Sequence, residues 1–174
     1  MIYLFGISRA YQICAHKPIE QGGLPHYNYR HLAFEYEKYL RDVVRIYKPQ
    51  TIVEEFSWPL LSKINEVDDD AFLVAKMVCL EMGRVEHKML DPACNDDCVE
   101  LSAMPAAVKK MQFCSTPASW NDSWLKQIRR PARDSSLLVC CANHITSLHK
   151  VLDSLSYKSS IICENFAARL SAAP

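Results

Sequence analysis

The chain has 174 residues, 49% of them hydrophobic and 23% charged, and its 20 basic and 20 acidic residues leave no net charge. This composition is typical of a soluble globular protein, and the length predicts one domain over residues 1–174. The zero net charge argues against nucleic acid or an anionic membrane as a partner, and no apolar run is long enough to span a bilayer.

The eight cysteines are predicted to be reduced rather than paired in disulfides. Cys140, Cys141 and Cys163 fall in strand-like apolar runs, and Cys79 falls on the apolar side of a predicted helix. Such positions suit buried thiols. They therefore predict a reducing, cytoplasmic location.

Five short apolar runs predict five strands. They cover residues 2–7, 51–55, 85–90, 137–142 and 160–163. A polar loop of about twenty residues follows the first run and is longer than most connections in compact domains. It contains His16 and His26, with His31 just beyond it. These histidines either reach a site beneath the loop or lie on the surface.

Helical periodicity predicts helices between these runs. The first begins near residues 28–31 and ends before Pro49. The acidic run at 68–70 is placed to open the second helix, and Gly83 to cap its end. A third helix begins after Asn121, and Asn143 is expected to cap a helix over residues 144–155. The alternation of strands and helices predicts an α/β fold, a three-layer domain with a mainly parallel sheet of about five strands.

A polar residue follows each apolar run, and parallel strands would bring these residues to one edge of the sheet, where open α/β folds bind ligands. Glu54 and Glu55 end the second run and are the leading candidates for catalysis. An acid at this position can bind metal, act as a base or hold a cationic ligand. Alternation along a strand sends the two carboxylates to opposite faces, so we expect only one of them to enter the site. The alternative is a salt bridge or a helix cap.

Three further strand ends carry candidate residues. His144 is either a general base or metal ligand, or an exposed residue beside a capping Asn143. Arg9, which follows Ser8, stays protonated and can clamp a carboxylate or phosphate. It is also expected to lie within hydrogen-bond reach of Glu54 or Glu55.

Asp91 follows the third run and fits a turn or cap role, or a place in the same site. Ser8, Arg9, Asp91 and Asn143 are therefore our candidate ligand-binding residues. Cys94 and Cys98, with His87 upstream, have a loose spacing and lack a second pair of ligands. We therefore predict no metal site there.

Four segments together resemble the broad TraB, ChaN and erythromycin-esterase-like group, in its small bacterial members. They are Gly6-Ile7-Ser8-Arg9, Ile52-Val53-Glu54-Glu55, Asp91-Pro92 and Cys141-Ala142-Asn143-His144. Characterised members of that group hydrolyse ester or amide bonds, or bind haem or metal. The resemblance therefore implies that Glu54 or Glu55, and His144, belong to the site.

One position departs from the family pattern. The first motif of the group normally ends in His, and Arg9 stands there in this chain. An arginine can neither accept a proton nor coordinate a metal. Hydrolysis is then lost, or a histidine of the long loop substitutes, or this branch binds an anion.

The sequence predicts a hydrolase acting on an ester, amide or phosphate bond of a small molecule, with a non-catalytic small-anion-binding or protein-interaction module as the alternative. In the first case Glu54 or Glu55 and His144 activate water, and Arg9 stabilises the developing negative charge. The identity of any cofactor is left open.

Overall fold

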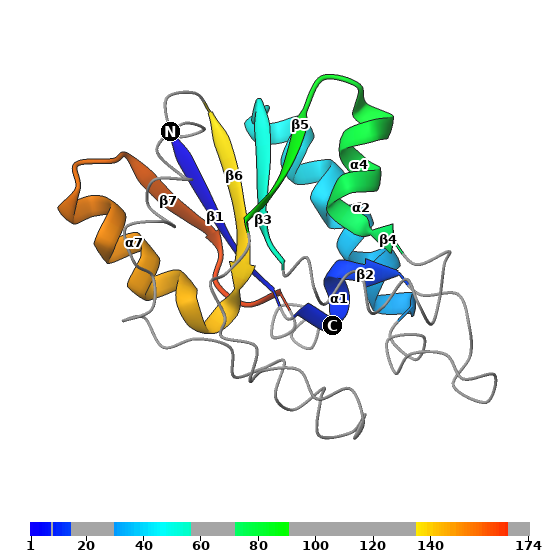
Figure 1. The fold of residues 1–174 in the computed structure, drawn as a ribbon, viewed down its shortest axis with the longest axis horizontal. Coiled ribbons are helices and arrows are strands. Elements are labelled where there is room, and N and C mark those ends of the chain that lie inside the picture. The colour runs from blue at the N-terminus through cyan, green and yellow to red at the C-terminus, as the bar shows by residue number, and fades with distance from the viewer. Residues whose placement is uncertain (8, 15–29, 57–71, 91–134, 167–174) are drawn as a thin grey trace.

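The computed structural model of the chain describes residues 1–7, 9–14, 30–56, 72–90 and 135–166 (Figure 1). Its centre is a five-stranded sheet of order β5-β3-β6-β1-β7, in which all neighbouring strands are parallel. The strands are β1 (Ile2–Ile7), β3 (Thr51–Glu55), β5 (Glu86–Leu90), β6 (Ser136–Cys141) and β7 (Ser159–Cys163). The predicted α/β class and parallel sheet are confirmed, and each strand bound differs from the prediction by one residue at most.

Helices cover both faces of the sheet. The helices α2 (Arg30–Tyr47) and α4 (Val74–Met82) lie on one face, and α7 (Ile145–Ser154) lies on the other (Figure 1). Ile52 of β3 packs in the core cluster beneath α2 and α4, whereas its neighbour Val53 packs in the cluster beneath α7. Central strands are apolar along most of their length because both of their faces are covered.

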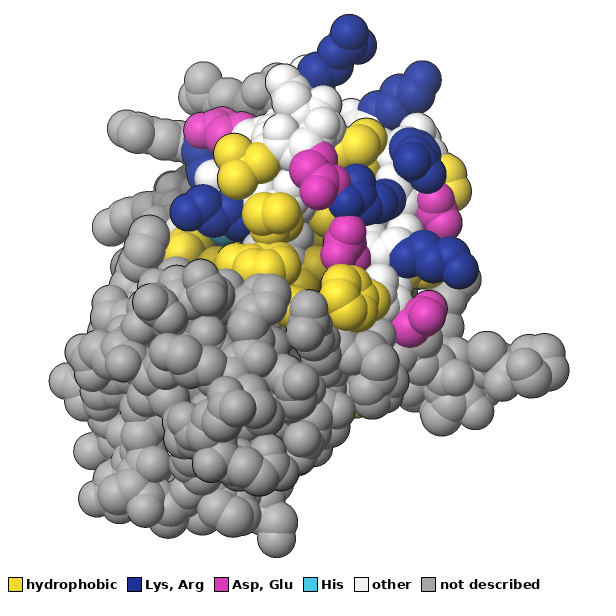
Figure 2. Space-filling model, turned by 90° about the vertical axis from the view of Figure 1, so that its right-hand side faces the viewer, with side chains coloured by type: hydrophobic (Ala, Val, Ile, Leu, Met, Phe, Trp, Pro, Cys, Tyr) yellow, Lys and Arg dark blue, Asp and Glu magenta, His cyan; other side chains and the backbone are white. Residues whose placement is uncertain are grey.

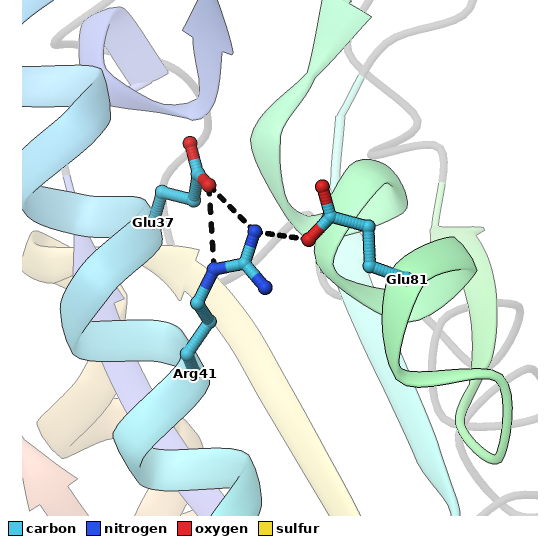
Figure 3. Close-up of polar contacts among 3 residues, drawn as sticks. All are labelled: Glu37, Arg41 and Glu81. Carbon is cyan, nitrogen blue, oxygen red and sulfur yellow. Dashed lines mark hydrogen bonds and ion pairs between the residues drawn. The ribbon is translucent and has the colours of Figure 1, made fainter.

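The helix α2 is amphipathic, as its sequence predicts. Tyr36 and Leu40 are fully buried against the sheet. On the outer side the Arg41 guanidinium bonds Glu37 one turn earlier at 2.7 Å, and it also pairs with Glu81 of α4 (Figure 3). Partly exposed ion pairs contribute on the order of 0–1 kcal/mol each. The contact between α2 and α4 therefore depends mainly on apolar packing.

The helix α4 starts later than the sequence predicts. The acidic run at 68–70 lies outside the described residues, and β4 (Phe72–Leu73) precedes the helix. This short strand pairs antiparallel with β2 (Ile13–Cys14), which follows the one-turn helix α1 (Arg9–Gln12). Its pairing with β2 holds the chain extended up to Leu73. The end of α4 is as predicted, because Gly83 has φ 63° and donates its N–H to the Cys79 carbonyl at 3.1 Å.

The predicted capping role of Asn143 is wrong. The 3-10 helix η6 (Ala142–His144) separates β6 from α7 and contains Asn143. The N-cap of η6 is Cys141 and the N-cap of α7 is His144, and neither makes a side-chain cap bond. The tight turn places His144 at the end of β3, where its ring faces Glu55. Leu155, the last residue of the predicted helix, lies just after the end of α7 and has 40% of its surface exposed.

The cysteine prediction is confirmed for the residues that the structure describes. Cys140, Cys141 and Cys163 are buried thiols that form no disulfide, and so is Cys79 in α4. Within the described part of the chain, no helix is both long and apolar enough to cross a membrane.

Candidate functional site

Two buried carboxylates mark the carboxyl edge of the sheet. Glu54 and Glu55 are the last residues of β3, with 0% and 1% of their surface exposed. Because all five strands run in the same direction, Asn143 after β6 and Glu164 after β7 lie at the same edge. Burying a carboxylate is costly unless hydrogen bonds or a charge partner compensate it. The contacts of these two acids therefore define the candidate site.

Glu55 lies on the α7 side of the sheet, on the same face as Val53. Its Oε2 accepts the backbone N–H of Cys141 at 2.9 Å and faces the Nδ1 of His144 at 3.4 Å. His144 is itself only 3% exposed. The acid and the histidine that the sequence assigns to catalysis are therefore in contact, within a buried environment.

Glu54 lies on the opposite side, beneath α2 and α4, and has its own histidine. Its Oε2 is 2.9 Å from the Nε2 of His87 on the neighbouring strand β5. Its Oε1 accepts a hydrogen bond from the Nε2 of Gln12 at 2.9 Å. Both carboxylate oxygens are therefore partnered by side chains. The two acids face opposite sides of the sheet as predicted, but each one meets a histidine.

Gln12 connects the two acidic positions. Besides its bond to Glu54, its Nε2 lies 3.4 Å from the backbone carbonyl of Glu55, and the residue is fully buried. Gln12 ends α1, the turn that directly follows β1 (Figure 1). Gln12 therefore links α1 to the end of β3 by hydrogen bonds.

Neither His87 nor Gln12 was among our predicted site residues. The signal for His87 was present, because alternation along β5 sets it on the same sheet face as Glu54 once β3 and β5 are paired. Gln12 carried no comparable signal, since a lone polar residue after a strand has many possible roles. Both lie far from residue 54 in sequence, and only the fold brings them to it.

Burial, together with the nearby carboxylates, suppresses the ionisation of two thiols. The pKa of Cys140 is raised well above its ordinary value, first by burial and then by the charges of Glu55 and of Cys141. Burial and Glu54 raise the pKa of Cys79 to about 12. Burial and Glu54 also raise the pKa of the Tyr36 hydroxyl well above its ordinary value. Thiolates are the reactive form of cysteine, so neither Cys79 nor Cys140 is suited to act as a nucleophile at neutral pH.

Other predicted residues are placed as follows. Ser8, Asp91 and the side chain of Arg9 lie outside the described residues, so the expected contact of Arg9 with Glu54 or Glu55 stays a prediction. Asn143 is exposed at the carboxyl edge, and Glu164 accepts a hydrogen bond from the Thr146 hydroxyl at 2.9 Å.

The described residues contain no group of three or more His, Cys, Asp and Glu side chains that could hold a metal ion. Cys94 and Cys98 lie outside this part of the chain. His87 contacts Glu54, so its position is explained by an acid–histidine pair.

Comparison of the chain with protein-family models, with curated proteins and with solved structures gives no match.

Proposed function

We propose that this protein is a hydrolase that uses His144 as a general base and Glu55 as its positioning residue. The observation that carries the proposal is the buried contact between Glu55 and His144 at the carboxyl edge of a parallel sheet. Parallel α/β sheets bind their ligands at this edge. The substrate class is a small molecule with an ester, amide or phosphate bond.

The chemistry follows from the hydrogen-bonding roles of the two groups. An ionised Glu55 only accepts hydrogen bonds, so Nδ1 of His144 must carry the proton that it shares with Oε2. The Nε2 atom of His144 then has a lone pair and can take a proton from water. The resulting hydroxide attacks the carbonyl carbon or the phosphorus, and the proton on Nε2 passes to the leaving group. Hydrogen bonds of this kind are often long without substrate, which fits the 3.4 Å separation.

Several neighbouring groups have supporting roles in this proposal. The Cys141 N–H holds one oxygen of Glu55 in place, and Gln12 holds the backbone at the same residue. Arg9 starts α1 at the same edge and is proposed to stabilise negative charge on the substrate. The raised pKa of Cys140 favours attack by water over attack by this thiol.

The proposal is in keeping with the esterase-like resemblance of the sequence, which stays a prediction. It also includes a cytosolic location, for which the buried thiols of Cys79, Cys140, Cys141 and Cys163 give support.

The test is a panel of chromogenic substrates: p-nitrophenyl acetate, an acyl p-nitroanilide and p-nitrophenyl phosphate. We expect the protein to hydrolyse one class, with kcat reduced at least roughly 100-fold in both His144→Gln and Glu55→Gln. His149→Gln is the matched control, because His149 lies on α7 in contact with Ser159 and Asp153 rather than with the buried acids.

Two outcomes would remove the proposed catalytic role of this edge of the sheet. One is no hydrolysis of any class by a folded protein. The other is hydrolysis that persists in the His144 and Glu55 variants. Either result leaves a binding or interaction role as the function of this edge.

A further inference from the structure

A cavity opens at the end of the sheet opposite to the acid–histidine pairs. Its volume is about 410 Å³. It is lined by Val44, Arg45, Lys48, Pro49, Gln50, Met82, Arg84 and Val85. These residues come from the ends of α2 and α4 and from the turns that lead into β3 and β5. The cavity therefore lies at the amino edge of the sheet, a site separate from the one proposed above.

The wall of this cavity is apolar and its rim is basic. Val44 and Pro49 are buried, and Met82 and Val85 are partly buried. Arg45, Lys48 and Arg84 are the charged lining residues, and all three are exposed. Figure 2 shows Lys and Arg side chains, with Asp and Glu side chains among them, around hydrophobic ones on the upper part of the view. An apolar wall with a few convergent charged groups is the usual design of a small-molecule pocket.

The positive charge of the rim is only partly compensated. Arg45 pairs with Asp42 at 3.2 Å, and the C-terminal ends of α2 and α4 each add about half a negative charge. Within the described ranges, no carboxylate lies at ion-pair distance from Lys48 or Arg84. The carboxylate of the nearby Glu86 is 3.1 Å from the Lys88 ammonium. A net positive charge therefore remains at the mouth of the cavity.

Lys48 occupies an unusual backbone conformation for this position. Its φ of 47° lies in the left-handed region, which costs a non-glycine residue on the order of 1–2 kcal/mol. A glycine directly after α2 would avoid this cost and would be the common choice. The chain instead has a cation here, on the rim of the cavity.

We propose that this cavity binds a small organic anion, with an apolar body against Val44, Pro49, Met82 and Val85 and an anionic group on Lys48 and Arg84. The volume suits a ligand of one or two rings, since ligand pockets begin near 300 Å³. The anionic group is a carboxylate, sulfonate or phosphate, all of which accept hydrogen bonds from Arg and Lys.

The probe is 1-naphthalenesulfonate, titrated into the full chain by calorimetry. Inorganic sulfate is the control ligand, because it carries negative charge but has no apolar body. We expect saturable one-to-one binding of the naphthalene compound and much weaker binding of sulfate. The Lys48→Gly/Arg84→Gln variant should bind the naphthalene compound at least roughly tenfold more weakly, because two charged donors are lost.

Lys48→Gly also keeps the test informative about folding, because glycine suits the left-handed backbone and should not destabilise the protein. The control variant is Lys38→Gln/Lys76→Gln, which removes one exposed cation from α2 and one from α4, both outside the cavity lining. It should bind as the parent does. No binding by the parent overturns the proposal, and so does binding that the first variant retains or that both variants weaken equally. None of these results depends on His144 or Glu55.

Discussion

At the scale of single residues, the buried acids are stable only because their oxygens have partners. Glu54 is bonded by Gln12 and His87, and Glu55 by the Cys141 N–H and His144. A buried carboxylate that loses a partner retains its full desolvation cost. The residues that hold these acids therefore contribute to stability in addition to the apolar core around them.

Gln12→Leu should lower the free energy of unfolding by about 1–3 kcal/mol. It removes the donor to Glu54 at 2.9 Å and to the Glu55 carbonyl at 3.4 Å, and leaves a buried oxygen without that bond. Urea denaturation measures the change. Gln50→Leu is the control, because Gln50 is exposed and its side chain should be worth less than about 0.5 kcal/mol. Equal effects from the two substitutions would show that the bonds of Gln12 do not support the acids.

At the scale of secondary-structure elements, α4 packs Cys79 close enough to the carboxylate of Glu54 to be affected by its charge. The pKa of its thiol rises from the ordinary value of 9.0 to about 12 in the folded protein. The folded-state value is higher than the unfolded one, so unfolding favours loss of the proton at alkaline pH. The stability that the protonated thiol contributes is complete below pH 9 and declines as the pH rises toward 12.

Cys79→Ala should therefore be most destabilising near neutral pH, and its effect should shrink as the solution becomes more alkaline. Urea denaturation of both proteins at a series of pH values measures this difference directly. Subtracting one stability curve from the other cancels the titration of the lysines and tyrosines that both proteins share. Parallel stability curves over the whole alkaline range would mean that the thiol of Cys79 is not held in its protonated form by burial and Glu54.

Two glycines in different elements should respond differently to alanine. In β1, a Cβ on Gly6 would meet the Glu164 carbonyl oxygen and lie 2.8 Å from Ile145 Cγ1. Because backbone cannot move aside as a flexible side chain can, Gly6→Ala should cost about 3 kcal/mol or more. At Gly83 a Cβ would meet nothing within 4 Å, and only the φ of 63° opposes it.

Gly83→Ala should therefore cost only about 1–2 kcal/mol. Thermal or urea denaturation of the two variants ranks them. A larger loss at Gly83 than at Gly6 would contradict the close approach of the chain after β7 to the end of β1.

At the scale of the whole molecule, the sequence predicts the sheet well because each strand is a short apolar run with its own local signal. The same runs predict the edge at which Glu54, Glu55 and His144 gather. The sequence predicts that Glu55 and His144 lie at the same edge of the sheet, but not that they are in contact. Their contact depends on the 3-10 turn that replaces the expected cap at Asn143.

Other features depend on contacts between distant segments, which no local pattern reports. Gln12 reaches Glu54 from 42 positions away, and His87 reaches it from a neighbouring strand. The pairing of β2 with β4 delays the start of α4 past Leu73 in the same way. The cavity at the amino edge is likewise built from two distant segments, residues 44–50 and 82–85.

In the proposed mechanism, Glu55 fixes the proton of His144 on Nδ1 and leaves Nε2 to act as a base. Long-range ¹H–¹⁵N correlation spectra of the histidine rings, recorded at about pH 8 where an ordinary histidine is neutral, report this proton directly. His144→Gln and His87→Gln assign the two signals. We predict the Nδ1–H tautomer for His144 and the opposite Nε2–H tautomer for His87, whose Nε2 faces Glu54 at 2.9 Å. A proton on Nε2 of His144 instead of Nδ1 would contradict the claim.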